Sequence, residues 1–201
     1  EFHFPFLAHA PMEPLTCTVQ VRDGKVQIWD GSQFQTVTQQ VTGVIAGVGA
    51  ENVAIETLFA GGSFGRRANF NSDYEAEAVM MALALGDGRP VKHVWTREDD
   101  TRGGYYRPMT KHRVTMAVDG EGKALAWHSR IANKSIFTGT PMAAGAVKDG
   151  VDHFSVEGAV DMTYAIPNLR VDVRNMETQV PVLWWRSVGH SHTGYAVEVA
   201  I

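Results

Sequence analysis

The stretch that most constrains this chain is Gly61-Gly62-Ser63-Phe64-Gly65-Arg66-Arg67, in which three glycines surround one aromatic residue and two cations follow. Glycine adopts positive φ angles and lets a ligand approach the backbone, and successive N–H groups in such a loop form an anion-binding concavity. An apolar, strand-like run at 53–59 precedes it. The loop therefore predicts either a plain turn or a seat for an anion or polar cofactor.

Two catalytic interpretations of the same loop can be compared at once. The Lys-Ser/Thr ending of a phosphate-binding P-loop is missing, which disfavours a nucleoside triphosphatase. Gly61-x-Ser63-x-Gly65 does fit the nucleophile elbow of serine hydrolases, with Ser63 as the nucleophile. In an elbow the helix begins almost at the serine, whereas the next helix start signal here is Ser72. The hydrolase and a non-catalytic domain stay open as alternatives.

Turn signals and hydrophobic periodicity predict an α+β fold, with mixed or antiparallel sheets and two or three helices that share one core. Asp23-Gly24 predicts a hairpin of residues 16–21 and 25–29, and the turn at 119–122 predicts a second one of residues 111–118 and 123–133. Residues 139–150, rich in Gly and Ala, predict a mobile loop. Further strands are expected after an extended lead-in at 1–15, namely at 53–59, 91–96, 156–164, 169–176 and 180–185.

Two apparent capping boxes predict the main helices. Ser32-x-x-Gln35 predicts a helix from Gln33 to about Gly47, so that Gln33 lies in its first turn, and Ser72-x-x-Glu75 predicts a helix that Gly86 ends. The expected buried stripes are Phe34, Val37, Val41, Val44 and Val48 in the first helix, and Ala76, Val79, Met80, Leu83 and Ala84 in the second. Residues 97–100 predict a solvated charged turn or short helix.

Composition limits the partners. With 201 residues, 44% of them apolar, the chain can bury one large or two small domains, and a subdivision near 100–110 is possible. A net charge of −4 with dispersed cations argues against nucleic acid and anionic membranes. Cys17 is the single cysteine, which excludes an internal disulfide. A start at Glu1 and an apolar run at 196–201 indicate a piece of a longer protein, and the location stays open between bacterial cytoplasm and periplasm.

A second candidate site lies late in the chain, at Trp184-Trp185-Arg186-Ser187-Val188-Gly189-His190-Ser191-His192. The planar guanidinium of Arg186 suits phosphate or carbonyl oxygens, and Trp185 offers a flat wall to an aromatic substrate. His190 and His192 would face one side of a strand, but no third zinc ligand lies nearby in the sequence. The alternative is a surface hairpin with a packed tryptophan.

Together these residues resemble the molybdenum-binding subunit of the xanthine oxidase and aldehyde oxidase family, most closely the bacterial isoquinoline 1-oxidoreductase β-subunit type. That family has a glutamine, then a Gly-Gly-x-Phe-Gly loop, then an aromatic-Arg turn. Here Gln33 stands 28 positions before Gly61, and Trp185-Arg186 occupies the late turn. The resemblance implies an oxidoreductase that hydroxylates N-heteroaromatic compounds or aldehydes with water as the oxygen source.

The resemblance also implies residue roles. Gln33 would hydrogen-bond an oxygen ligand of molybdenum, the backbone at Gly62, Phe64 and Gly65 would lie against the molybdopterin cofactor, and Arg186 would hold its pterin. The segment at 8–14 is similar to the family's His-Ala-x-Met-Glu-Pro segment, which implies a place near the substrate pocket for His9 and Glu13. Trp185 is expected to supply the substrate-stacking wall, since Ser187 and Val188 replace the family's usual Gly-Phe pair. No residue here is expected to bind the metal directly.

The resemblance leaves some parts outside the chain. The family's catalytic glutamate, a general base, is not among these residues, so the fragment alone is expected to be inactive. The [2Fe–2S] clusters need cysteines that are absent here and imply a small iron-sulfur partner subunit, and the cofactor is expected in its cytosine dinucleotide form. Ala68 after Arg67 disfavours a purine substrate, and Ser63, Ser187 and Val188 depart from the family pattern.

Overall fold

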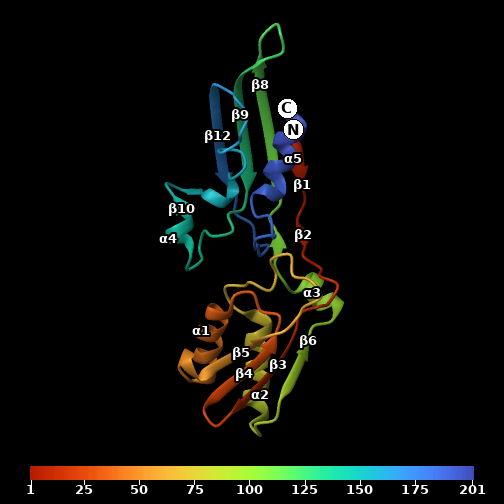
Figure 1. Ribbon diagram of the computed structural model, residues 1–201, viewed down its shortest axis with the longest axis vertical. Helices are drawn as coiled ribbons and strands as arrows, with labels where there is room; N and C mark the ends of the chain where they lie inside the picture. The colour runs from red at the N-terminus through yellow and green to blue at the C-terminus, as the bar shows by residue number, and fades with distance from the viewer. The chain divides into compact units, whose positions relative to one another are not determined.

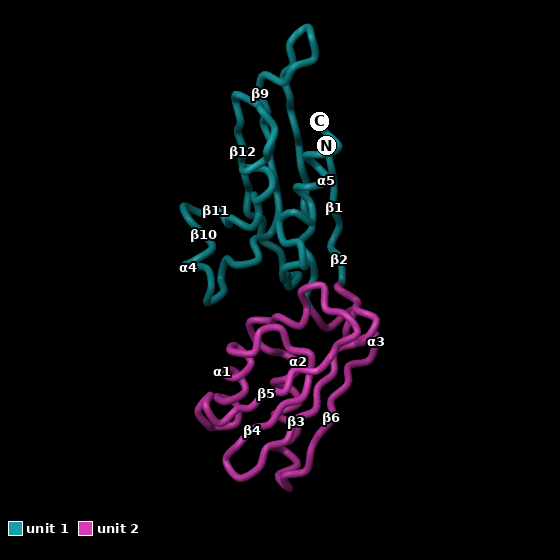
Figure 2. Tube along the Cα trace, in the orientation of Figure 1, with its two compact units in different colours: residues 1–8, 105–201 teal, residues 9–104 magenta.

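The computed structural model describes all residues from Glu1 to Ile201. They form two compact units, one of residues 9–104 and the other of residues 1–8 and 105–201 (Figure 2). Each unit has its own four-stranded sheet and its own apolar cluster. The predicted α+β fold with mixed sheets is confirmed, whereas the prediction of one shared core is wrong.

In the unit of residues 9–104, two helices pack against a mixed sheet (Figure 1). The sheet has the order β5-β4-β3-β6, and β4 pairs in parallel only with β5, which follows it through a helical crossover. The strands are β3 (Thr16–Arg22), β4 (Lys25–Asp30), β5 (Val53–Thr57) and β6 (Val91–Val94), and the helices are α1 (Gln35–Ala46), η1 (Ala50–Asn52), α2 (Asp73–Leu85) and α3 (Arg97–Arg102).

The first predicted hairpin is confirmed. Strands β3 and β4 pair antiparallel, and Asp23 and Gly24 between them have φ angles of 51° and 72°. Positive φ at both central residues is the backbone of a turn that matches the twist of the strands. By contrast, β5 ends at Thr57, two residues earlier than predicted, and Phe59 beyond it is fully exposed.

Both main helices form, but neither capping box does. Helix α1 begins at Gln35, so Gln33 precedes the helix, and the hydroxyl of Ser32 instead accepts from the N–H of Phe34 at 3.3 Å. Ser72 precedes α2 with a φ of 45° and makes no cap hydrogen bond. The hydroxyls of Ser72 and Thr38 lie 3.0 Å apart, which joins the two helices. The Ser72 side chain, which the sequence pattern assigns to a helix cap, thus makes a hydrogen bond to the other helix instead.

The buried helix faces also differ from the predicted stripes. Helix α1 buries Thr38, Thr42 and Gly43, while Val44 is 81% exposed. The close approach of α1 to α2 favours small residues, and the Thr42 hydroxyl is satisfied by the Thr38 carbonyl at 2.6 Å. In α2, Ala76 and Val79 are buried as expected, whereas three predicted core residues are exposed, namely Met80, Leu83 and Ala84.

Two carboxylic acids lie inside this unit. Asp30 and Glu75 are 3% and 1% exposed, and the Tyr74 hydroxyl donates to Asp30 at 3.0 Å. Burial raises the pKa of both carboxyls, and for Glu75 the pKa lies well above its usual range because the charge of Asp30 adds to the effect. Burial and the charge of Asp30 thus favour the neutral, protonated form of Glu75.

Glu75→Gln should stabilise the chain at neutral pH. A raised carboxyl pKa favours folding at low pH and costs stability as the pH rises above the unfolded value, and glutamine copies the neutral acid. We expect the Tm to rise at pH 8 and to change little at pH 4, by about 2–4 °C for each kcal/mol gained. The exposed Glu98→Gln is the matched control, and an unchanged Tm for Glu75→Gln at pH 8 would contradict a buried neutral acid.

In the unit of residues 1–8 and 105–201, the sheet has the order β1-β8-β9-β12 (Figure 1). The predicted second hairpin, β8 with β9, is confirmed, and β12 joins β9 in parallel. The remaining elements include two short strand pairs and two helices. The bounds are β1 (Phe2–Phe4), β2 (Leu7–Ala8), β7 (Tyr106–Arg107), β8 (Thr110–Val118), β9 (Ala124–Asn133), α4 (Ala143–Ala146), β10 (Val147–Lys148), β11 (Val151–Asp152), η2 (His153–Ser155), β12 (Asn168–Asn175) and α5 (His190–Ala200).

Several late predictions are wrong. Residues 156–164 form turns, and residues 180–185 contribute one bridge, at Val182, instead of a strand. Val156 and Ala159 still enter the core, so the apolar pattern indicated burial but not strand pairing. The predicted loop at 139–150 contains α4 and part of a small hairpin. His190 and His192 begin a helix, not a strand, which gives five α-helices instead of two or three.

Helix α5 packs on the sheet through a histidine pair. Nε2 of His112 on β8 lies 2.8 Å from Nδ1 of His192, and the rings are 1% and 5% exposed. Burial lowers the pKa of His112 to about 4 and that of His192 to about 3. Both rings are therefore neutral above pH 6.5.

None of the helices has the length and apolar character that a membrane span requires.

The histidine pair should make the stability depend on pH. The unfolded chain binds protons near pH 6.5 and the buried rings do not, so the contribution of the pair to stability is highest above pH 6.5 and falls towards pH 4. The slope is about 1.4 kcal/mol per pH unit for each ring. His192→Gln should flatten this slope in urea unfolding experiments, while the exposed His3→Gln should leave it unchanged. An equal slope in both variants would contradict this account.

Candidate functional site

The glycine loop has the open backbone that the sequence predicts. Gly62, Phe64 and Gly65 have φ angles of 105°, 56° and 110°, and no regular element forms between Thr57 and Asp73. The left-handed backbone costs energy at Phe64, which is not glycine, so the surrounding contacts must hold it. The Phe64 side chain is 41% exposed.

Two buried arginines support this loop. Arg66 and Arg67 are each 1% exposed. Arg66 donates two hydrogen bonds to Asp73, at 3.0 and 2.5 Å, and its guanidinium lies 5.2 Å from the centre of the Trp95 ring. Arg67 donates to the carbonyl of Gly62 at 2.9 Å. Both guanidinium groups lie beside carboxylates, Asp73 and Glu13, so the two arginines stabilise the loop from behind.

Glu13 connects a distant segment to the same loop. Its carboxylate accepts a short hydrogen bond from the N–H of Gly61 and lies 3.6 Å from Nη2 of Arg67. The N–H of Glu13 in turn donates to the carbonyl of Gly61 at 3.1 Å. Glu13 was predicted to lie in the substrate pocket, and in the structure its contacts are made to the loop.

Helix α3 secures the segment next to Glu13. Arg97 donates to the carbonyls of Pro11 and Met12 at 2.7 and 3.0 Å, and it pairs with Asp100 at 2.8 Å. Asp100 is 5% exposed, and burial raises its pKa. The prediction that residues 97–100 are simply solvated is therefore wrong for Asp100.

Gln33 is joined to the loop through its backbone. Its N–H donates to the carbonyl of Arg67 at 3.0 Å, and the preceding Ser32 N–H donates to the Asp30 carboxylate at 2.9 Å. The Gln33 side chain is exposed and makes no hydrogen bond within the chain. Gln33, Glu13 and the loop therefore come together within one unit. His9, in the same unit, is 4% exposed.

Trp185 and Arg186 belong to the other unit, in the turn before α5. The N–H of Val188 donates to the carbonyl of Trp185 at 2.8 Å, and Val188 has a φ of 47°. Gly189 donates to Glu157 at 2.6 Å, in a site where an added Cβ would lie 2.3 Å from the Phe154 carbonyl oxygen. Arg186 is exposed and makes no ion pair.

The serine hydrolase interpretation is wrong. The Ser63 hydroxyl accepts from the N–H groups of Gly65 and Arg67 at 3.3 and 3.0 Å. No histidine bonds to it, and the next helix begins at Asp73. Ser63 shapes the loop and lacks the base that a nucleophile needs.

The residues present fit a polar, anionic cofactor. The loop offers backbone groups without Cβ atoms at Gly62 and Gly65, and buried arginines support it from behind. The side-chain amide of Gln33 is exposed and makes no hydrogen bond within the chain. No three His, Cys, Asp or Glu side chains gather where they could bind a metal ion. A metal here would need to arrive with an organic ligand that the loop can hold.

Sequence reasoning missed part of this support. Asp30 and Arg97 act through contacts with residues far away in the chain, Tyr74 and Pro11, and no local motif marks them. Asp100 pairs with Arg97 three residues away, but its burial could not be read from the sequence. The role of Arg67 was also missed, although two cations after a glycine loop were a usable signal.

Comparison with known proteins agrees with this geometry. A family model described as the molybdopterin cofactor-binding domain matches residues 1–201. The chain belongs to this family. It is 28% identical over 201 residues to the isoquinoline 1-oxidoreductase subunit beta of Brevundimonas diminuta, with 98% of this chain and 25% of that protein covered. The resemblance to the xanthine oxidase and aldehyde oxidase family is confirmed.

Other relatives agree. A membrane-bound aldehyde dehydrogenase of Gluconacetobacter polyoxogenes is 31% identical over 98% of this chain and 26% of its own length. The aldehyde oxidoreductase of Desulfovibrio gigas has the same fold, with a TM-score of 0.72, 23% identity, and coverage of 97% of this chain and 20% of that one. The chain thus spans about a quarter of the length of the curated relatives it matches.

Gly61→Ala should disturb the loop. An added Cβ would lie 2.5 Å from the Cβ of Glu13, so the two segments must separate. Overpacking of this kind costs about 1–3 kcal/mol, which urea unfolding measures. Gly120→Ala is the matched control, because a Cβ there meets nothing within 4 Å and neither residue has a positive φ. Equal midpoints for the two variants would show that the Glu13 contact is not tight.

Proposed function

We propose that this chain supplies part of the molybdopterin cradle of a molybdenum hydroxylase, an oxidoreductase that oxidises N-heteroaromatic compounds or aldehydes with water as the oxygen source. The observation that supports this most is the meeting of Gln33 with the glycine loop through the Arg67 carbonyl. Family membership and the names of the relatives, which include oxidoreductases of isoquinoline and of aldehydes, support the same activity. Ala68 after Arg67 disfavours a purine.

We assign the roles by chemistry. The backbone at Gly62, Phe64 and Gly65 would lie against the cofactor, since two of these residues have no Cβ. The free amide of Gln33 would donate a hydrogen bond to the molybdenum centre, and the free guanidinium of Arg186 would bind the pterin, because planar donors suit its oxygens. When bound, the cofactor supplies the redox chemistry of the reaction.

Three side chains of this chain are assigned to the substrate pocket. We assign Trp185 to the pocket as an aromatic wall, and from the family resemblance we assign Glu13 and His9 to it as well. Because Glu13 contacts Gly61 and Arg67, its contribution is to position the loop. His9 lies in the same segment of the chain and is buried.

Other parts of the enzyme lie outside these residues. We propose that the general-base glutamate belongs to another part of the subunit, that electrons leave through [2Fe–2S] clusters on a small partner subunit, and that the cofactor is the cytosine dinucleotide form. Cys17 is the sole cysteine and is buried, so this chain has no cysteine set for a cluster. Metal, iron and nucleotide analysis of the complete subunit with its partner tests these assignments.

Gln33→Ala and Arg186→Ala should change different quantities in the complete enzyme. Removing a donor that acts in the transition state typically lowers kcat about 10²- to 10³-fold, so Gln33→Ala should keep its molybdenum and lose rate. Charge-assisted hydrogen bonds hold the cofactor itself, so Arg186→Ala should lower molybdenum and pterin content. Metal content by mass spectrometry and turnover per bound metal separate the two effects.

Gln40→Ala is the matched control, since Gln40 is an exposed glutamine on α1. It should keep both metal and rate. Full metal content with normal turnover per metal in both Gln33→Ala and Arg186→Ala would show that neither residue lies at the site.

A further inference from the structure

One face of the sheet β1-β8-β9-β12 is rich in cations. Side chains alternate along a strand, so the opposite face carries Phe4 and His112, which pack against His192 and Tyr195 of α5. The exposed face has twelve residues on three strands, and we call it the basic face. They are Lys111, Arg113, Thr115, Ala117, Ala126, His128, Arg130, Ala132, Asn168, Arg170, Asp172 and Arg174, with Glu1 and His3 of the N-terminal segment beside them.

The charge on the basic face is concentrated. Its unit has ten Lys and Arg residues and ten Asp and Glu residues, yet five of the cations and two of the acids, Glu1 included, lie here. All five cations are exposed. The whole chain carries a net charge of −4, so this positive surface is opposite in sign to the rest.

Ion pairs within the basic face neutralise only part of its positive charge. Arg113 binds Glu1 at 2.7 Å, and Asp172 accepts from both His128 and Arg170, at 2.7 and 3.0 Å. Those contacts lower the pKa of Asp172, with the His128 hydrogen bond as the largest cause.

Two cations are left without an ion pair, Lys111 on β8 and Arg174 on β12. Both line the same hollow of about 270 Å³, together with Arg113 and Arg130. An excess of positive charge is therefore open to a partner.

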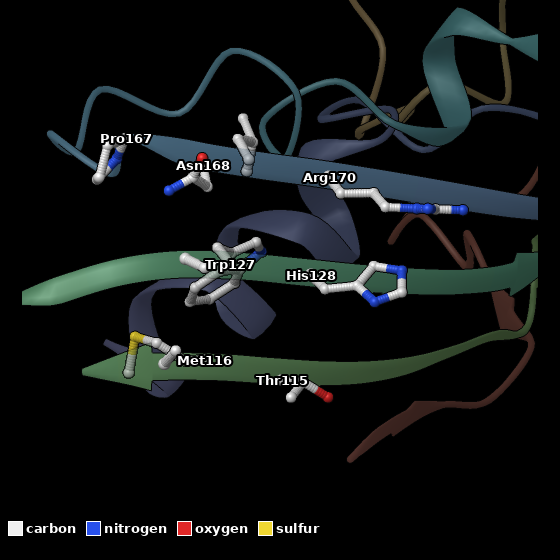
Figure 3. A pocket seen from close by; sticks show the side chains of 10 residues that line it. Thr115, Met116, Trp127, His128, Pro167, Asn168 and Arg170 are labelled. Atoms are coloured by element: carbon white, nitrogen blue, oxygen red, sulfur yellow. The ribbon is translucent and has the colours of Figure 1, made fainter. Parts of the chain in front are cut away.

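The basic face is also hollowed. A second cavity of about 490 Å³ lies over its other end, where the small side chains of Ala117 and Ala126 leave space. Figure 3 shows Thr115, His128 and Arg170 around it, from three neighbouring strands. Side chains of another molecule can enter both hollows between the cations.

We propose that the basic face docks a separate protein that presents an acidic surface. Complementary charge guides such encounters and selects the partner. Nucleic acid fits less well, because Trp127, which lines the larger cavity, is 1% exposed and offers no ring on which bases stack. The carboxylates of Glu1 and Asp172 also repel phosphates. The same carboxylates can accept hydrogen bonds from basic side chains of a protein, which carries both signs of charge. The inference does not depend on the proposed enzymatic function.

A labelled acidic peptide tests this surface. The probe is a 14-residue peptide in which Glu alternates with Thr, titrated with the full chain and followed by fluorescence anisotropy. Binding should weaken about tenfold or more with Lys111→Glu combined with Arg174→Glu, and it should weaken with salt. The matched control is Lys123→Glu with Lys148→Glu, two exposed lysines elsewhere in the same unit, for which we expect less than a twofold change.

Two further measurements make the outcome decisive. Lys111→Gln with Arg174→Gln removes the charge without reversing it and should give an intermediate loss, and circular dichroism checks that each variant folds. Equal binding by the reversed and control variants, or no binding by the unaltered chain, overturns the proposal. Tighter binding of single-stranded DNA of equal charge also overturns it, because the surface would then prefer a phosphate backbone.

Discussion

The candidate site depends on the contacts that the buried guanidinium of Arg67 makes with the glycine loop and with Glu13. It is 1% exposed, donates to the Gly62 carbonyl and lies beside the carboxylate of Glu13, which itself accepts from Gly61. Removal of Glu13 would leave the buried guanidinium without its carboxylate partner. These contacts hold the left-handed backbone of Phe64 in place. The loop is therefore organised before any ligand arrives, which lowers the entropy cost of binding.

The interior of both units is more polar than an apolar core alone would require. Helices α1 and α2 meet through Thr38 and Ser72, and α5 meets the sheet through His112 and His192. Buried polar groups of this kind contribute little net energy when paired and cost much when a partner is lost. They specify one helix register more than they add stability, and they make the fold sensitive to pH at Glu75 and at the histidine pair.

The fold is retained at low sequence identity. Relatives that are 28% and 31% identical match nearly the whole chain, and a solved structure at 23% identity has the same fold. A loop that uses backbone groups places few demands on side chains, apart from glycine where a Cβ would collide. Gly61 is such a position, since its added Cβ would meet Glu13.

The sequence by itself determined the α+β class, both hairpins, the approximate helices α1 and α2, the family and the loop, because each is written in local turn chemistry, periodicity or a short motif. The two cores, the helix at His190 and the turns at 156–164 were decided by tertiary structure. Tertiary structure also decided that α1 buries its threonines, and it brought Glu13 and Arg97 into contact with distant backbone groups. Periodicity reports which residues can be buried, but the partner that buries them lies tens of residues away. Only the folded chain brings Arg67 under Gly62 and against Glu13, 54 positions earlier in the sequence, as hydrogen bonding of buried polar groups requires.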